Sequence, residues 1–499
     1  MTTQAGFRLS PPQKRLWQHQ GDDVWRTRCL IRIDGELRPG EIRAALAEVV
    51  RRNEILRTGF RLFAGAALPL QVIFDGAPLA YDEHDLGGRS TPEQEAWLAE
   101  AYDELLRRPI DLAQGPVFHA VLARLGASRQ ALLLALPSLN ADAASLPRLA
   151  RRVLLASVAL RGNQGLPDEP AQYADLAEWA IEQLDGEEAR DETARWRERN
   201  LADAPALRLP FGRTGANASF RMETVAWTLP EGFLGRLGRI EGDPESFLLA
   251  GWQALIRRLT GAAEASVGIS VHGRDYEGLE EALGLLERVV PLGLPPQEEV
   301  PGLGKLSLNV KDAVRERRER QHLFSWDAAG RDGTAASPPF LHFAFRYVDD
   351  PPLPSAEGLS VSIEEMDARV DRFGIQVAIR RTGEGARAEL NYDADVYERA
   401  EIERLAGFYG ALLADALERP DAPFDDLTLL GEAERRRVLD EFNPGGPGFP
   451  HDRQVHEVIE EWAKRTPDAP AVACGAGALS YRELHTRAEA LARRLRAQG

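Results

Sequence analysis

Apolar residues form an unbroken run from Ala131 to Leu136, and a polar turn follows the run directly. The run has the length of a strand, is too short to cross a membrane, and is typical of a strand covered on both faces. Pro137 ends the run, and Ser145 can cap the helix that the following spacing of leucines predicts. A strand, a tight turn and a helix therefore meet at four polar residues: Ser138, Asn140, Asp142 and Ser145.

The same periodicities predict a mixture of helices and strands along the chain. Helices are expected over 10–19, 39–53, 91–108, 145–153, 172–184, 244–259, 304–321 and 401–417. Strands are expected over 26–33, 56–60, 117–125, 131–136, 222–229, 265–271, 283–294, 339–348 and 374–381. The two halves share an order of elements without an obvious repeated sequence, and a polar connector at 212–219 separates them. This shared order predicts two related lobes that face each other across a cleft.

A helix followed by a Pro/Gly stretch at 432–448 predicts a linker near the end of the sequence. About 50 residues follow it, and they are too few to form a stable unit alone. We therefore expect the chain to stop inside a larger protein.

The amino-acid composition argues against several classes of function. The chain has 499 residues, 44% of them hydrophobic and 28% charged, which is ordinary for a soluble protein of two to four domains. A net charge of −17 argues against nucleic acid or an anionic membrane as partner. Cys29 and Cys474 are too few for a disulfide framework or a cysteine zinc site, so a reducing cytoplasm is expected. The sequence shows neither a secretory signal nor a run of membrane length, and its nine histidines lack metal-ligand spacing.

Several segments, in this order and at these distances, resemble the condensation domain of nonribosomal peptide synthetases. They are SPPQKRLW at 10–17, RRNEILRTGF at 51–60, QYADLAEW at 172–179 and HGRDYEGLEEALGLLERVVPL at 272–292, in which Arg288 stands where asparagine is usual. RTPDAPAV at 465–472 and LSYREL at 479–484 resemble the start of an adenylation domain. The resemblance implies an N-terminal lobe over 1–185, a C-terminal lobe over 186–430, a linker over 431–453, and a truncated adenylation domain over 454–499.

The implied fold is α/β, of the two-layer α+β kind. Two lobes similar to chloramphenicol acetyltransferase would meet as a V-shaped pseudo-dimer around a central tunnel. The implied reaction joins a donor acyl or peptidyl thioester to the amine of an acceptor aminoacyl thioester and forms an amide. The partners would be an upstream donor and a downstream acceptor peptidyl carrier protein, together with the adjoining adenylation domain. No cofactor would be bound covalently by this chain, because the carrier proteins deliver the phosphopantetheine arms.

The family's HHxxxDG motif falls on 137–143, where Pro137 and Ser138 replace both histidines. The second histidine is the one usually given the catalytic or positioning role. Asp142 remains, and so does Arg274, which in the family pairs with this aspartate under the active site. Removing one partner of such a pair would leave a buried charge, so the pair can persist as a structural ion pair without the histidine.

Three residues are candidates for the chemistry: Asp142, Ser138 and His272. An Asp142 paired with Arg274 would have a lowered pKa and be a weak base, and the Ser138 hydroxyl is also a poor base. Asn140 and Ser145 are candidates for substrate contacts. His272 lies two residues before Arg274, and if the strand continues, both side chains point to the same side.

Two other functions stay open on the sequence. The domain could be a catalytically inactive scaffold that docks carrier proteins or gates their traffic. It could instead be a cyclisation or other modifying variant, since Asp142 and Ser145 match the second half of the DxxxxDxxS motif of cyclisation domains. Holding a thioester and an amine together can supply ~7 kcal/mol or more of the barrier reduction. Amide formation therefore remains the first expectation.

Overall fold

The computed structural model describes residues 6–20, 24–76, 79–162, 170–198, 207, 209–213, 220–229, 232–238, 242–262, 266–293, 302–326, 341–349, 353, 355, 358–382, 385–442, 452–475 and 477–498. The chain divides into two compact units, Met1–Leu429 and Leu430–Gly499. Most of the connector predicted at 212–219, and residues 443–451 of the predicted linker, lie outside the described residues.

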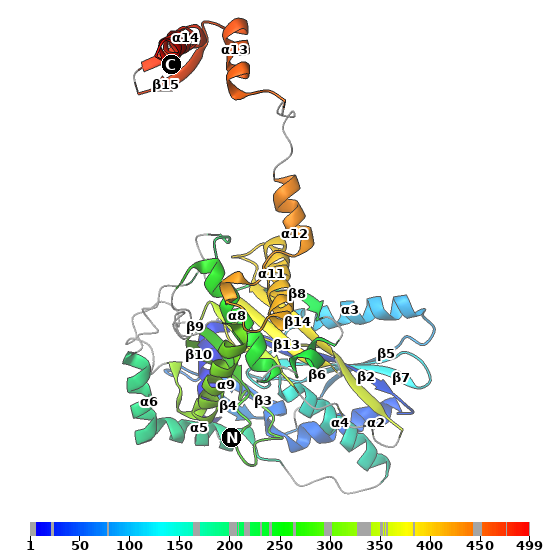
Figure 1. Ribbon diagram of the computed structural model, residues 1–499. Coiled ribbons are helices and arrows are strands. Elements are labelled where there is room, and N and C mark those ends of the chain that lie inside the picture. The colour runs from blue at the N-terminus through cyan, green and yellow to red at the C-terminus, as the bar shows by residue number, and fades with distance from the viewer. Residues whose placement is uncertain are drawn as a thin grey trace. The chain divides into compact units, whose positions relative to one another are not determined.

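One lobe of the first unit is built on a five-stranded sheet in the order β12-β2-β7-β6-β5 (Figure 1). Its strands are β2 (Arg26–Asp34), β5 (Ala80–Asp85), β6 (His119–Arg124), β7 (Arg129–Pro137) and β12 (Ser360–Ala368). Neighbouring strands are antiparallel except β5 and β6, which are parallel. The helices α2 (Pro39–Arg52), α3 (Thr91–Arg107) and α4 (Ser145–Arg161) belong to the same lobe.

Strand β7 is buried on both faces, as its apolar run predicts. Leu132, Leu134 and Leu136 share a core cluster with residues of α2 and α4. Leu133 and its neighbours on the opposite face pack with α3 instead. Because alternate side chains of a strand point to opposite faces, this run has a core on each side. The prediction of a doubly covered strand is confirmed.

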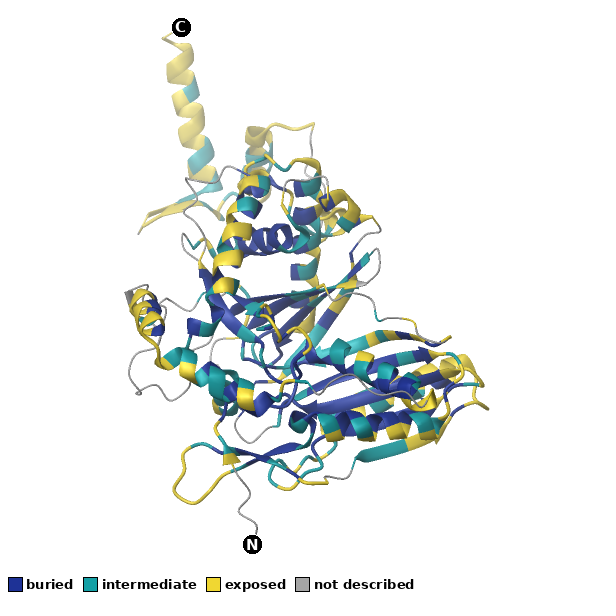
Figure 2. Cartoon of the chain, turned by 90° about the horizontal axis from the view of Figure 1, so that it is seen from below, coloured by how far each residue is buried: buried dark blue, intermediate teal, exposed yellow. Residues whose placement is uncertain are grey.

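The other lobe is built on a six-stranded mixed sheet in the order β10-β9-β11-β13-β14-β8. Its strands are β8 (Met222–Thr228), β9 (Ser266–Val271), β10 (Arg288–Gly293), β11 (Phe343–Val348), β13 (Ile375–Thr382) and β14 (Gly385–Asp393). Its helices are α7 (Phe233–Leu237), α8 (Pro244–Thr260), α9 (Leu303–Glu319) and α11 (Arg399–Glu418). In Figure 2 the strands of the sheets are mainly dark blue, and exposed residues gather on the outer helices.

A third group of elements completes the first unit. A small sheet in the order β1-β4-β3 contains β1 (Gly6–Phe7), β3 (Thr58–Arg61) and β4 (Leu70–Ile73). The helical elements are α1 (Pro11–Gln20), η1 (Glu54–Arg57), α5 (Tyr173–Asp185), α6 (Glu187–Glu198), η4 (Gln321–Leu323) and η5 (Phe424–Asp426). A core cluster that joins residues of both halves, such as Leu16, Leu139 and Phe373, packs them together.

Strand β12 was not predicted from the sequence, and it crosses between the lobes. Its residues belong to the predicted C-terminal lobe, yet it pairs with β2 from Ser360 opposite Asp34 to Ala368 opposite Thr27. A bulge between Ile363 and Glu365 interrupts its register, and Glu364 follows Ile363 directly. The bulge therefore breaks the alternation of apolar and polar residues, so the sequence pattern does not predict this strand. A division of the lobes at 185 and 186 does not hold for this strand.

The second unit contains α12 (Glu432–Arg436), a π-helical turn (Arg437–Glu441), α13 (Val455–Arg465), β15 (Pro470–Cys474), β16 (Gly477–Ser480) and α14 (Tyr481–Arg496). Strands β15 and β16 form an antiparallel pair. Several of its large apolar side chains are exposed, among them Trp462, Val472, Leu491 and Leu495. In the part of the chain that the structure describes, no helix combines the length and the apolar character needed to span a bilayer.

Candidate functional site

A buried ion pair connects the two lobes. Asp142 lies in the turn between β7 and α4, and Arg274 lies in the loop that follows β9. The Arg274 guanidinium donates from Nη1 to Oδ2 of Asp142 at 3.0 Å and from Nη2 to Oδ1 at 2.9 Å. Both side chains are 0% exposed. The structure therefore brings together the two residues that the resemblance pairs.

Other protein groups satisfy the remaining hydrogen-bonding positions of Asp142 and Arg274. Arg274 also donates from Nε to the carbonyl of Ala282 at 2.9 Å and from Nη2 to the carbonyl of Gly284 at 3.1 Å. Oδ1 of Asp142 accepts from the Ser145 amide at 2.9 Å and from the Ser145 hydroxyl at 2.7 Å. We refer to Asp142, Ser145 and Arg274 as the inter-lobe clamp. The sequence predicts that Ser145 caps α4. In the structure α4 begins at Ser145, and the Asp142 carboxylate accepts the first N–H of the helix instead.

The clamp also changes the backbone of the opposite lobe. The amides of Leu286 and Glu287 donate to Oδ2 of Asp142, each at 2.9 Å. These amides therefore cannot serve a strand ladder there, and β10 begins only at Arg288. The prediction of a strand over 283–294 is wrong for the residues before Arg288.

The clamp fixes Asp142 as an anion. Burial alone would raise the pKa of its carboxyl group, but the charge and hydrogen bonds of Arg274, with those of Ser145 and the Glu287 amide, outweigh burial. The pKa of Asp142 is therefore lowered below its ordinary value. A carboxylate held in this way is a weak base, so the clamp supports a structural role.

Ser138 is fully buried and bonded within its own lobe. Its hydroxyl lies 3.1 Å from the hydroxyl of Thr27, which donates to the carbonyl of Ala141 at 2.7 Å. Its amide donates to the carbonyl of Trp25 at 2.8 Å. With 0% of Ser138 exposed, this side chain offers no surface to a substrate in this conformation.

Asn140 and Ser145, the predicted substrate contacts, are occupied by protein groups. The amide nitrogen of Asn140 donates to the carbonyls of Ile55 and Thr58, both at 2.8 Å, and ties the turn to the segment between α2 and β3. Ser145 belongs to the clamp. Both residues are buried and support the turn, and Oδ1 of Asn140 is a buried acceptor without a hydrogen-bond partner among the described residues.

His272 lies beyond the end of β9 and does not continue the strand. The chain turns at Gly273, which has a φ of +70°. Nδ1 of His272 accepts from the Arg274 amide at 3.1 Å, and Nε2 lies 3.4 Å from Oδ1 of Asp275. Burial and the neighbouring cations, Arg274 included, lower the pKa of His272 although Asp275 raises it. The imidazole is therefore neutral near pH 7, but its Nδ1 lone pair already has a donor.

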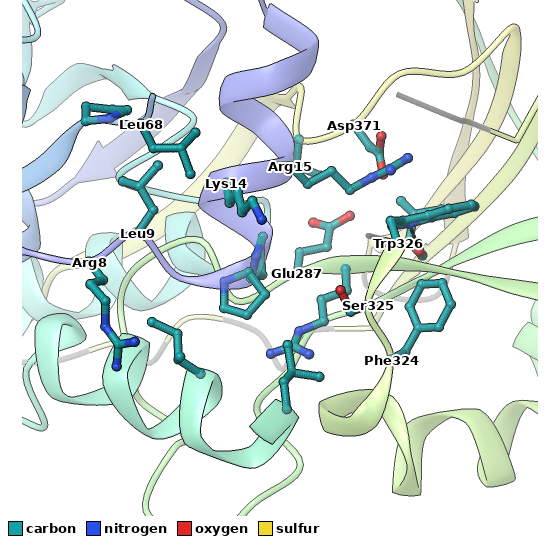
Figure 3. Close-up of a pocket in the computed structure, with 18 of the residues that line it drawn as sticks. Arg8, Leu9, Lys14, Arg15, Leu68, Glu287, Phe324, Ser325, Trp326 and Asp371 are labelled. Atoms are coloured by element: carbon teal, nitrogen blue, oxygen red, sulfur yellow. Dashed lines mark hydrogen bonds and ion pairs between the residues drawn. The ribbon is translucent and has the colours of Figure 1, made fainter. Parts of the chain in front are cut away.

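A cavity of about 390 Å³ lies between the lobes, where residues 8–15, 68–70 and 181–185 of the N-terminal half line one side and residues 287–289 and 324–326 of the C-terminal half line the other (Figure 3). Its walls include Leu9, Lys14 and Arg15 at and just before α1, Glu287 and Arg288 at the start of β10, and Trp326 and Asp371. All of these except Arg288 are labelled in Figure 3. Arg15 donates to Asp371 at 2.7 Å, and its guanidinium lies 4.2 Å from the centre of the Trp326 ring. The cavity wall is thus charged as well as aromatic.

Glu287 lines this cavity, and its backbone amide donates to Asp142 of the clamp. Its side chain is 4% exposed and accepts from Nε of Arg346 at 2.9 Å. Burial, and also the charge of Asp142, raise the pKa of Glu287, while Arg346 opposes the shift. A carboxyl group with a raised pKa is better suited to move a proton near neutrality than Asp142 is.

Sequence reasoning missed Glu287, Arg288 and Arg346 as residues of the site. The signals for the first two were the two charges inside the apolar stretch LGLLERVVPLGL and, for Arg288, its place where the family usually has asparagine. Nothing local marks Arg346 as the partner of a residue 59 positions away. Among the described residues, the structure contains no group of three or more His, Cys, Asp or Glu side chains placed to hold a metal ion.

A family model described as "Condensation domain" matches residues 3–439. The chain belongs to the condensation-domain family. Over 99% of its length it is 27% identical to bacitracin synthase 1 of Bacillus licheniformis, and over 98% of its length it is 30% identical to phosphinothricin tripeptide synthetase PhsB of Streptomyces viridochromogenes. The chain spans 9% of the first of these proteins and 43% of the second, and less than a fifth of six further synthetase proteins that it matches.

Solved structures of condensation domains have the same fold. The starter condensation domain of rhizomide synthetase RzmA aligns with a TM-score of 0.72 at 18% identity, over 85% of this chain and 98% of that one. The X-domain in a complex with OxyB from teicoplanin biosynthesis aligns with a TM-score of 0.68 at 23% identity, over 87% of this chain and 98% of that one. These similarities confirm the mixed α/β two-lobe fold expected from the sequence.

Proposed function

We propose that this condensation domain receives carrier-bound thioesters in the cavity between its lobes and forms an amide bond there. The donor would be an acyl or peptidyl thioester, and the acceptor would be the amine of an aminoacyl thioester. Upstream and downstream carrier proteins would deliver both on phosphopantetheine arms, in a reducing cytoplasm. The exposed apolar side chains of the second unit would be covered by the rest of an adenylation domain.

The observation that carries the proposal is the position of Glu287. It is a buried carboxylate on the wall of a cavity shared by both lobes, and its own amide is bonded to the inter-lobe clamp. The clamp sets where the second lobe stands against the first, and Glu287 is fixed with it. This geometry supports a chemical role for Glu287 in place of the missing histidine.

The reaction then needs one proton acceptor. The acceptor nitrogen attacks the thioester carbonyl, so a C–N bond forms and the C–S bond breaks. The Glu287 carboxylate takes the proton that the nitrogen loses and returns it to the departing thiolate. Proximity supplies the larger share of the rate, ~7 kcal/mol or more, and a general base adds about 100- to 10,000-fold.

A reconstituted assay tests this function with a loaded donor carrier and a loaded acceptor carrier. We expect amide product from the native chain and at least a ~100-fold lower rate from Glu287→Gln, which keeps the shape and loses the base. Glu287→Asp should keep part of the rate. His272→Gln is the matched control and should retain most of the activity. Equal rates for native chain and Glu287→Gln would contradict the role of Glu287, and a product lighter by one water would indicate cyclisation instead.

The burial of Ser138 favours a second candidate, a scaffold that docks a partner without catalysis. One structural relative is described as a complex of the X-domain and OxyB, so a domain of this fold can hold a partner protein. Absence of amide product with every donor and acceptor pair, together with retained binding of a carrier protein, would support this second candidate.

A further inference from the structure

Arg288 lines the cavity, and among the described residues it has no acidic partner. Its Nη1 donates to the backbone carbonyl of Gln321 at 3.0 Å. No ion pair joins Arg288 to a carboxylate within the part of the chain that the structure describes. The Tyr173 and Tyr276 hydroxyls are bonded to other groups, to the carbonyl of Leu285 at 2.6 Å and to Nδ1 of His322 at 2.7 Å. A second, longer bond from Nη1 of Arg288, at 3.5 Å, goes to the carbonyl of His322, and two neutral carbonyls compensate a guanidinium only in part.

The other charged arginines of this wall have acidic partners. Arg8 pairs with Glu178 at the rim, and Arg15 pairs with Asp371. Glu287, the residue next to Arg288, is bonded to Arg346 and faces a different cation. The contrast singles out Arg288 among the arginines of the cavity.

Burial makes this unbalanced charge costly. It lowers the pKa of the Arg288 guanidinium, yet arginine remains protonated in proteins at neutral pH. An oxyanion placed against the guanidinium would replace lost hydration with charge-assisted, bidentate hydrogen bonds. Apolar neighbours on the same wall, such as Leu9, Phe324 and Val370, suit the carbon chain of such a ligand.

We infer that Arg288 is the receptor for an oxyanion of the ligand that occupies the cavity between the lobes. The inference rests on the proposed function, because the ligand is then a thioester. In such a ligand the oxyanion is either a carboxylate on the acyl or aminoacyl group or the phosphate of the phosphopantetheine arm. Arg288 is in this account a specificity residue, and the family's usual asparagine at this position would lack its charge.

The test compares three non-hydrolysable amide analogues by isothermal titration calorimetry with the full chain. Glutaryl-pantetheine carries a carboxylate, pentanoyl-pantetheine is its neutral match, and pentanoyl-4′-phosphopantetheine carries only the phosphate. Hydrogen bonds to charged groups are worth about 1.5–3 kcal/mol, so the preferred anion should bind about 10- to 100-fold more tightly than the neutral probe. Arg288→Asn should abolish that preference, and Arg288→Lys should keep part of it.

Arg8→Gln is the matched control, because Arg8 lines the same cavity but already has Glu178 as its partner. It should leave the preference for the anionic probe within about threefold, since exposed pairs contribute little. A preference confined to the glutaryl probe identifies a substrate carboxylate, and one confined to the phosphorylated probe identifies the arm. Equal binding of all three probes overturns this inference alone. Binding of none overturns the proposed function as well.

Discussion

Replacing Asp142 by asparagine tests how much stability the inter-lobe clamp contributes. The carboxylate accepts two bonds from Arg274, two from Ser145, and one each from the amides of Leu286 and Glu287. Asparagine has nearly the same shape, but its NH₂ group would face donors, and the buried Arg274 would lose its counter-charge. Breaking a buried pair from one side costs about 3–5 kcal/mol. We expect Asp142→Asn to lower the free energy of unfolding by that amount.

Urea unfolding followed by tryptophan fluorescence measures the effect. Eight of the nine tryptophans lie within residues 1–429, so the signal reports mainly on the unit that contains the clamp. The matched control is Glu403→Gln, which breaks the exposed pair with Arg399 (58% and 52% exposed) and should cost less than about 0.5 kcal/mol. The double variant Asp142→Asn/Arg274→Gln removes both charges, keeps an oxygen that can accept from the Leu286 and Glu287 amides, and should be more stable than Asp142→Asn. A cost below about 1 kcal/mol for Asp142→Asn would refute the account of the clamp.

Four further outcomes follow from the same geometry. The pKa of Asp142 is lower in the folded chain than in the unfolded chain, where it is about 3.9. The ionised carboxylate therefore stabilises the folded state fully above that pH. The difference in unfolding free energy between the native chain and Asp142→Asn should shrink below about pH 4. Because the pKa of Glu287 is raised, the rate of amide formation should rise with pH through a value above the ordinary ~4.3 of glutamate, and Glu287→Gln should remove this limb of the pH–rate profile. Ser138→Ala should change that rate by much less than the ~100-fold of a lost general base, and Ser138→His should cost about 1–3 kcal/mol in urea unfolding by overpacking a buried site. Gly284→Ala should cost more than about 2 kcal/mol, because its φ is +132° and the added Cβ would lie 2.0 Å from Cδ2 of Tyr173.

The sequence is sufficient to predict helices and strands where the local spacing of apolar residues determines them. The apolar run of β7 and the amphipathic face of α4 predicted both elements, although each extends beyond its predicted range. The irregular segment before β10 had no such signal, because the amides of Leu286 and Glu287 bond to a carboxylate in the other lobe. Apolar periodicity reports on burial and not on where a backbone amide donates, so a strand was predicted there.

The candidate site was predictable only in part for a related reason. The pairing of Asp142 with Arg274 came from the resemblance to the family, since 132 residues separate the two. Residue type alone made Ser138 and Asn140 chemical candidates, but the Ser138 hydroxyl is bonded to Thr27, and the amide nitrogen of Asn140 is bonded to Ile55 and Thr58. Which polar groups are already satisfied depends on distant backbone and is not visible in the sequence.

Strand β12 has a consequence for any attempt to split or recombine this domain. It covers β2 along nearly its whole length, and β2 is mostly buried. A fragment ending near residue 185 would lack this cover and present an open, apolar strand edge, which is prone to intermolecular pairing. Chimaeras exchanged at the midpoint of the sequence would therefore separate a strand from the sheet it finishes, and exchange points after residue 368 should give the more soluble hybrids.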